Sequence, residues 1–325
     1  MFSALKAFIG SSSTTAEIFF VSETVATVGS PSTLKFNKVN LDQTAQKDLA
    51  LNFKTSFQSE VIDISTGVTT LGKVSSLASS SNAVYEYDIV PKAPIFLEIE
   101  AISLLTVASN VPAFDFTTQP LEKVKGIVIK LTDGNTSLYL YQHKFPIALH
   151  KKSKLSFMSS QGNILTRVNH DVIDINKNID FFMFGGVHYI VNIKRLESSY
   201  GLDVVINNMV AQAIPRIVAL NIIDMSAHAK PLEIFDDLKK SRSGMRKIAK
   251  ILNGRVLNIG LTIPQIEDVC RDFPVFGRHI SFTNNLVDLS SQTKKLLFLR
   301  MLNDEAVRSA LTNDVSLADD RESAA

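Results

Sequence analysis

The chain has 325 residues, 45% of them hydrophobic, and a net charge of only +2, so it can build a large core and is not a disordered polyelectrolyte. Its single cysteine, Cys270, excludes an intramolecular disulfide and is typical of a reducing compartment. No window holds the roughly 18 to 20 apolar residues that cross a bilayer, and the N-terminus is a poor secretory signal. We therefore expect a cytoplasmic protein.

The front of the chain mixes strand and helix patterns. In chain order we expect strands at 16–22 and 33–40, a helix at 42–57, a strand at 85–90, and an apolar segment at 94–108 that is either helix or strand. The helix rests on a four-residue spacing of apolar side chains that ends at Phe53 and Phe57.

The middle of the chain predicts an antiparallel β-meander, and the back predicts helices. The expected strands are 124–131, 137–143, 154–160, 164–168, 172–175, 179–184 and 187–193. Short linkers such as Asp133-Gly134-Asn135 and Gly185-Gly186 favour antiparallel neighbours, because parallel strands need long crossovers. The expected helices lie near 202–222, 230–242, 243–253, 263–271 and 290–303.

A run of strands followed by a run of helices indicates an α+β fold. Pro112 and the polar run at 117–120 suggest a boundary. We therefore predict a mixed N-terminal domain at 1–118, an α+β domain at 119–313 whose meander packs against a helical bundle, and a flexible acidic tail at 314–325.

Positive charge is concentrated in the back of the chain. Residues 1–120 hold 7 lysines, no arginine and 11 acidic residues, whereas residues 121–313 hold 26 basic and 17 acidic residues. The densest block is 238–255, LKKSRSGMRKIAKILNGR, with seven basic residues and no acidic one. Solvated helix faces usually mix signs, so this block predicts a polyanionic partner. A membrane surface would favour flanking Trp, and the chain has none, so nucleic acid is favoured.

A helical wheel separates charge from apolar residues within this block. The basic line consists of Lys239, Arg242, Arg246 and Lys250, and the opposite side consists of Met245, Ile248 and Leu252. We expect two abutting helices, with Ser243 as the N-cap of the second and Gly254 just beyond its end. The predicted DNA-binding residues are Lys239, Lys240, Arg242, Arg246, Lys247, Lys250, Arg255, Lys151, Lys152, Lys154, Lys294 and Lys295.

Other motifs are weaker indications of function. The segment GVTTLGKV at 67–74 resembles a phosphate loop but has Val74 where a Ser or Thr hydroxyl is needed. None of the six histidines pairs at i,i+4 or lies beside a cysteine, so we expect neither a metal nor a cofactor. Cys270 falls on the apolar side of its predicted helix and is expected to be a buried structural thiol.

The order of elements within about 150–200 also resembles a known family. The segment KKSKLSFMSS, then VIDINKNIDFFMFGGVHYIVN, then helices, is similar to the domain of unknown function in the KwaB component of the bacterial Kiwa antiphage system. The resemblance implies a cytoplasmic homodimer that binds DNA with little sequence preference. It also implies a transmembrane partner of the KwaA type, which would recruit the protein to the inner membrane.

We therefore expect a non-enzymatic defence protein that occludes DNA rather than cutting it. Two alternatives stay open. One is a metal-dependent nuclease, for which Glu98 and Glu100 would alternate on one strand face if 94–108 is a strand. The other is a scaffold whose basic face docks an acidic protein.

Overall fold

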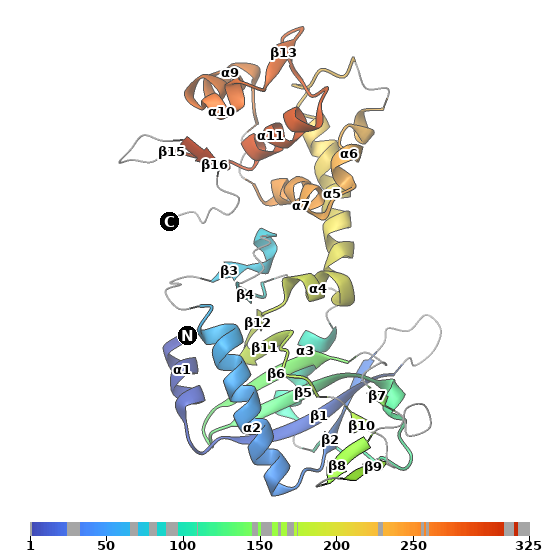
Figure 1. Cartoon of the computed structure of the whole chain (residues 1–325). Helices are drawn as coiled ribbons and strands as arrows, with labels where there is room; N and C mark the ends of the chain where they lie inside the picture. The colour runs from blue at the N-terminus through green and yellow to red at the C-terminus, as the bar shows by residue number, and fades with distance from the viewer. Residues whose placement is uncertain are drawn as a thin grey trace. The chain divides into compact units, whose positions relative to one another are not determined.

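The fold is α+β, as predicted from the order of sequence patterns, with a large antiparallel sheet followed by helices (Figure 1). The computed structural model describes residues 2–24, 33–65, 71–77, 83–88, 97–108, 110–144, 149–150, 158–161, 164–167, 172–173, 175–226, 230–254, 257, 260–308 and 315–317. Within the described helices, none combines the length and apolar content that a bilayer crossing requires.

The chain divides into two compact units, each described here by itself. Unit 1 comprises residues 1–74 and 80–200, and unit 2 comprises 75–79 and 201–325. The predicted boundary at 118/119 lies between strands that the structure pairs in one sheet, with Ile18 opposite Ile129. The polar run at 117–120 belongs instead to a turn in which the Asp115 carboxylate accepts a hydrogen bond from the Thr117 backbone N–H at 2.8 Å.

Unit 1 is built on an eight-stranded sheet in the order β2-β1-β5-β6-β11-β12-β4-β3. The strands are β1 (Thr15–Thr24), β2 (Thr33–Val39), β3 (Gly72–Lys73), β4 (Tyr85–Glu86), β5 (Val124–Thr132), β6 (Ser137–His143), β11 (Phe181–Phe184) and β12 (Val187–Ile190). All neighbours are antiparallel except β3 and β4. Backbone N–H and C=O groups in this ladder therefore join segments more than 100 residues apart.

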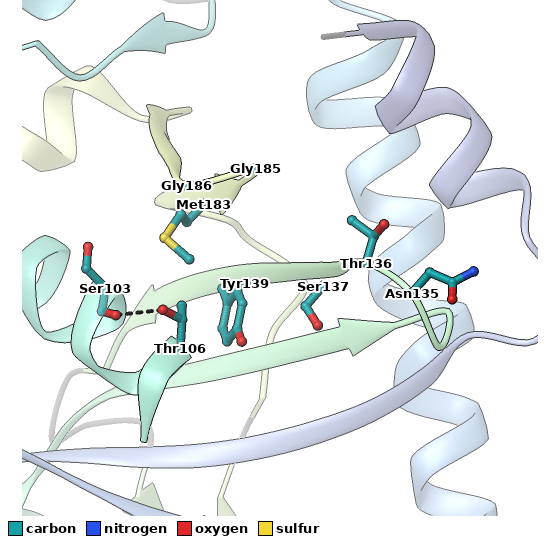
Figure 2. Close-up of a pocket in the computed structure, with 9 residues that line it drawn as sticks. All are labelled: Ser103, Thr106, Asn135, Thr136, Ser137, Tyr139, Met183, Gly185 and Gly186. Atoms are coloured by element: carbon teal, nitrogen blue, oxygen red, sulfur yellow. Dashed lines mark hydrogen bonds between the residues drawn. The ribbon is translucent and has the colours of Figure 1, made fainter. Parts of the chain in front are cut away.

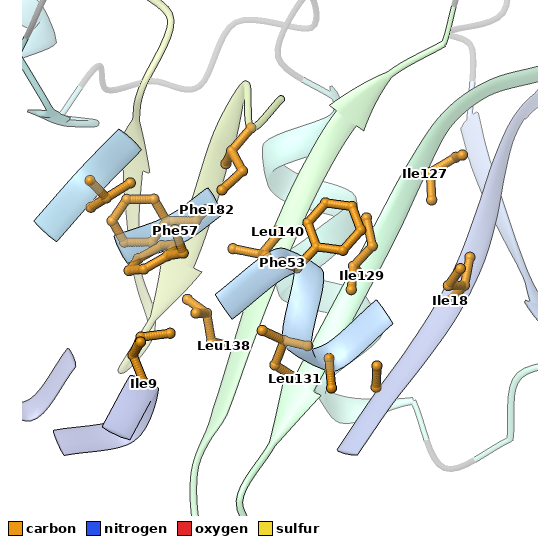
Figure 3. Close-up of a cluster of buried hydrophobic side chains, with 14 of the residues drawn as sticks. Ile9, Ile18, Phe53, Phe57, Ile127, Ile129, Leu131, Leu138, Leu140 and Phe182 are labelled. Carbon is orange, nitrogen blue, oxygen red and sulfur yellow. The ribbon is translucent and has the colours of Figure 1, made fainter. Parts of the chain in front are cut away.

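The helices of unit 1 cover both faces of this sheet. They are α1 (Phe2–Gly10), α2 (Gln43–Phe57), the π-helical turn η1 (Gln58–Ile62), the 3-10 turn η4 (Leu121–Lys123), α3 (Leu97–Val107) and α4 (Ile193–Tyr200). The 3-10 turn η2 (Val74–Ser76) begins at the last residue of a unit 1 segment and continues into unit 2. Figure 3 shows the buried cluster under α2, where Phe53 and Phe57 meet Leu140 and Phe182. The Phe57 and Phe182 rings lie 4.9 Å apart in an edge-to-face arrangement.

The predicted meander is present, but it is shorter than the sequence suggested. Strands β5, β6, β11 and β12 follow one another in the sheet. The described strands between β6 and β11 lie outside this sheet and pair among themselves. In the predicted regions, β8 (Met158–Gln161) pairs with β9 (Ile164–Arg167), and β10 (Val172–Ile173) pairs with β7 (Leu149–His150), a strand that the sequence did not predict.

The described residues of unit 2 form helices and two antiparallel pairs of short strands. Its helices are α5 (Leu202–Val218), η6 (Pro231–Glu233), α6 (Asp236–Lys239), α7 (Arg242–Lys250), η7 (Ile251–Asn253), α9 (Ile263–Asp272), α10 (Pro274–Gly277) and α11 (Gln292–Leu302). Its strands are β13 (Ser281–Thr283) with β14 (Leu286–Asp288), and β15 (Ala306–Arg308) with β16 (Val315–Leu317). Strand β16 lies in the predicted flexible tail, whose last residues fall outside the described part of the chain.

We expect Gly126→Ala to lower the free energy of unfolding by about 1 to 3 kcal/mol, the usual effect of overpacking a core. A Cβ on Gly126 would overlap the Tyr141 hydroxyl and lie 2.5 Å from Tyr141 Cζ. Tyr141 is 1% exposed and stacked on Phe181 at 4.5 Å, so it has no room to move. Because the chain has no tryptophan, denaturant unfolding is best followed by circular dichroism.

Gly10→Ala is the matched control, because nothing lies within 4 Å of a Cβ at the end of α1. We expect its effect to stay within about 0.5 kcal/mol. Equal effects of the two substitutions would contradict the proposed overlap at Gly126.

Candidate nucleic-acid interface

Helix α7 carries most of the predicted DNA-binding residues, and its start is fixed by a serine and a glycine. The Ser241 hydroxyl accepts a hydrogen bond from the Gly244 backbone N–H at 3.0 Å. The predicted N-cap, Ser243, lies inside the helix instead. A Cβ on Gly244 would overlap the Leu238 carbonyl oxygen, so only glycine lets α7 begin this close to the end of α6. The expected break between two helices is therefore real, but it falls at Lys240 and Ser241.

The inner face of α7 is apolar, as the helical wheel predicted. Ile248 and Ala249 are fully buried, and the helix contacts α5 and α11. Met245 and Leu252 are half-buried. Gly254 ends η7 with extended backbone at φ −75° rather than in the left-handed conformation expected of a glycine after a helix.

Two lysines of α7 face a buried carboxylate rather than open solvent. Glu305, 1% exposed, lies just beyond α11. Its carboxylate oxygens lie 3.5 Å from Lys247 Nζ, 3.9 Å from Lys250 Nζ and 3.7 Å from Arg300 Nε. The side chains of these cations are 13%, 22% and 22% exposed. We call Lys247, Lys250 and Arg300 the inner group.

The turn that delivers Glu305 is itself attached to α7. The Asn303 side-chain N–H donates to the Lys247 backbone carbonyl at 2.9 Å. Asp304 takes the left-handed conformation, φ +53°, which reverses the chain after α11. The Glu305 backbone N–H then donates to the Arg300 carbonyl at 3.0 Å. This turn therefore holds the carboxylate against the inner group.

Three other predicted residues are also paired with acidic side chains. Lys239 lies 2.5 Å from the carboxylate of Asp236 on the same helix. Lys295 on α11 lies 3.1 Å from Asp237, and its side chain is 11% exposed. Lys294 is paired with Asp288. The block thus lacks acidic residues in the sequence but not in space, and the like-charge repulsion expected there is partly relieved within the protein.

The residues on the open side of the block are Lys240, Arg242 and Arg246, which we call the outer group. Lys240 and Arg242 are exposed, and Arg246 is half-buried. The first turn of α7 contains no acidic residue. Of the remaining predicted DNA-binding residues, Lys151, Lys152, Lys154 and Arg255 lie outside the described residues.

The carboxylates named for the nuclease alternative occupy a helix. Residues 97–107 form α3, so Glu98 and Glu100 do not alternate on a strand face. Burial raises the pKa of Glu98 to about 7. Across the described ranges, no three His, Cys, Asp or Glu side chains are grouped closely enough to hold a metal ion.

The structure gives no support for catalysis by Cys270 or for phosphate binding by the described part of the segment at 67–74. Cys270 is half-buried in α9, and burial raises its pKa to about 11, so its thiol is a poor nucleophile. Of the phosphate-loop-like segment, Gly72 and Lys73 form the short strand β3, and most of the rest lies outside the described residues.

Comparison with known proteins identifies the family. The family model described as Kiwa protein KwaB-like matches residues 121–312, which is more than half of the chain and extends from η4 past β15. Kiwa protein KwaB of Escherichia coli O55:H7 (strain RM12579 / EPEC) is 23% identical over 254 residues, covering 76% of this chain and 78% of that protein. No solved structure matches. The chain therefore belongs to the Kiwa protein KwaB-like family.

Proposed function

We propose that this chain, a Kiwa antiphage defence component by its family, binds the phosphate backbone of DNA through the outer group, on α7 and just before it. Lys240, Arg242 and Arg246 are the contacts that reach the polyanion. Binding occludes the DNA and does not cut it. The chain acts as a homodimer in the cytoplasm together with a transmembrane partner, which brings it to the inner membrane.

The observation that carries the proposal is the concentration of basic side chains on α7 and directly beside it. One carboxylate, Glu305, is shared by the three cations of the inner group. These four residues therefore carry two more positive than negative charges. The outer group adds three positive charges, from Arg242 and Arg246 on α7 and from Lys240 just before it. Basic residues concentrated in this way favour a polyanion, because bound phosphates release condensed counterions.

The inner group stabilises the helix that carries most of the outer group, but it does not bind phosphates itself. Pairing with Glu305 holds Lys247 and Lys250 against the turn that follows α11, so their release to a phosphate would leave a buried carboxylate with fewer counter-charges. Phosphate contacts fix position and carry no base information, which is consistent with little sequence preference.

A scaffold that docks an acidic protein remains the competing reading, since a carboxylate-rich surface satisfies the same cations. DNA affinity then would be no greater than that of any protein with similar surface charge. Substitution of exposed arginines outside α7 distinguishes DNA binding through α7 from docking of an acidic protein.

The double substitution Arg242→Gln/Arg246→Gln is expected to weaken binding to unrelated duplexes alike, because the lost contacts are to phosphates. The slope of log affinity against log salt should fall by about 2, close to 0.9 for each phosphate contact removed. Fluorescence anisotropy with two duplexes of unrelated sequence at several salt concentrations measures both quantities.

Arg271→Gln/Arg278→Gln is the matched control, because it removes the same charge from exposed positions on α9 and at the end of α10. We expect its salt slope to match that of the wild type. If both double variants lose the same affinity, or if the wild type shows no salt dependence, DNA is not bound through α7 and the acidic-protein reading takes its place.

Glu305→Gln is expected to lower the free energy of unfolding by about 3 kcal/mol, since it leaves partly buried cations without their counter-charge. Adding Lys247→Gln should restore part of this loss, with a coupling energy of about 1 to 2 kcal/mol in a double-mutant cycle. Chemical denaturation of the four proteins, followed by circular dichroism, supplies the cycle. Strictly additive effects would show that Glu305 and Lys247 do not interact.

A further inference from the structure

A cavity of about 340 Å³ opens on the face of the unit 1 sheet opposite the core of Figure 3. It lies where the β5–β6 and β11–β12 turns come together next to α3 (Figure 2). It is lined by Ser103, Thr106, Asn135, Thr136, Ser137, Tyr139, Met183, Gly185 and Gly186. Its volume lies within the range of about 300 to 1,000 Å³ that is usual for small-molecule sites.

Tyr139 is a buried residue that lines this cavity. The residue is 7% exposed, and Lys130 Nζ lies 5.9 Å from its ring centroid. Among the described residues, the Tyr139 hydroxyl makes no hydrogen bond. Figure 2 shows the hydroxyls of Tyr139 and Ser137 pointing the same way from strand β6. The Tyr139 hydroxyl can therefore form a hydrogen bond with a polar group of a ligand.

The neighbouring hydroxyls are held in fixed places. The Ser103 hydroxyl lies 3.3 Å from Nε2 of His188, which is 6% exposed. Thr106 Oγ1 donates to the Ser103 carbonyl at 2.7 Å. Ser137 Oγ lies 2.5 Å from Thr132 Oγ1. These bonds orient the lining before any ligand arrives, which lowers the entropy cost of binding.

Two further polar groups are left for a ligand at the rim. Within the described part of the chain, neither the Asn135 amide nor the Thr136 hydroxyl makes a hydrogen bond, although the backbone N–H groups of both donate to Asp133. Gly185 and Gly186 have φ of +59° and +80°, and nothing lies within 4 Å of a Cβ built on either. The turn therefore leaves the mouth of the cavity open.

The chemistry of the lining determines what can bind. None of the nine lining residues is charged, so an ionic ligand would lose hydration without gaining a counter-charge. The nearby Lys130 is already paired with Glu17 at 3.3 Å. Hydroxyl and amide groups both donate and accept hydrogen bonds, and adjacent ligand hydroxyls do the same. The Tyr139 ring and Met183 add an apolar surface for the C–H face of a ring.

We propose that this cavity binds an uncharged ring that carries adjacent hydroxyls, which is either a free sugar or the ribose of a nucleoside. Tyr139 supplies the hydroxyl that recognises the ring, and Thr136 and Asn135 contact it at the rim. The proposal is independent of DNA binding by α7.

Saturation-transfer-difference NMR on the full chain tests the proposal with D-glucose, D-galactose, D-ribose, adenosine and 2′-deoxyadenosine. We expect at least one of these compounds to bind. Tyr139→Phe and Thr136→Val should each weaken its affinity about 2- to 10-fold, which corresponds to one hydrogen bond. Neither substitution removes an internal side-chain hydrogen bond, so both proteins should remain folded. Tyr189→Phe, on the opposite face of the same sheet, is the matched control and should leave affinity unchanged.

The compounds distinguish the two sources of the ring. Tighter binding of adenosine than of 2′-deoxyadenosine identifies a nucleoside, whereas binding of the free sugars alone identifies a carbohydrate. The proposal is overturned if none of the five compounds binds, if Tyr139→Phe and Tyr189→Phe behave alike, or if glucose 6-phosphate binds Tyr139-dependently and more tightly than glucose.

Discussion

The backbone ladder between β1 and β5 is the constraint on which the rest of unit 1 depends. It joins the N-terminal strand to the start of the family-matched region, with Thr15 opposite Thr132 at one end. The pairing sets which side chains of β5 face α2 and which face α3, because the side-chain period of a strand is two. The apolar core under α2 contains side chains from both strands of this pair, and the hydroxyl-lined cavity lies on the other face of the same sheet.

Unit 2 depends in a similar way on a charge. Glu305 reaches α7 from a turn held by Asn303, and it divides the basic block into cations that stabilise the fold and cations that face outward. A helical wheel describes only the spacing of side chains along one helix. It cannot show that a carboxylate more than 50 residues downstream occupies part of the basic face.

Local patterns predicted the elements well where one interaction dominates. The four-residue spacing before Phe57 gave α2, and glycines in the β5–β6 and β11–β12 turns gave both hairpins. Residues 94–108 were ambiguous because α3 is apolar on several sides, with Leu104 63% exposed. Ser243 competed with Ser241 as the cap of α7, and packing against Leu238 decided between them. The division into units and the acidic partners of the basic block depend on long-range contacts, which spacing does not encode.

The sharing of Glu305 restricts how the sequence around α7 can change. An added lysine near Lys247 would compete for a carboxylate that already serves three cations, so it would raise the charge while loosening the fold. Loss of the carboxylate would be tolerated best where one of its cations is lost as well. Substitutions at Glu305 and at the three cations of the inner group are therefore coupled. A redesign of the basic face of α7 must include Glu305.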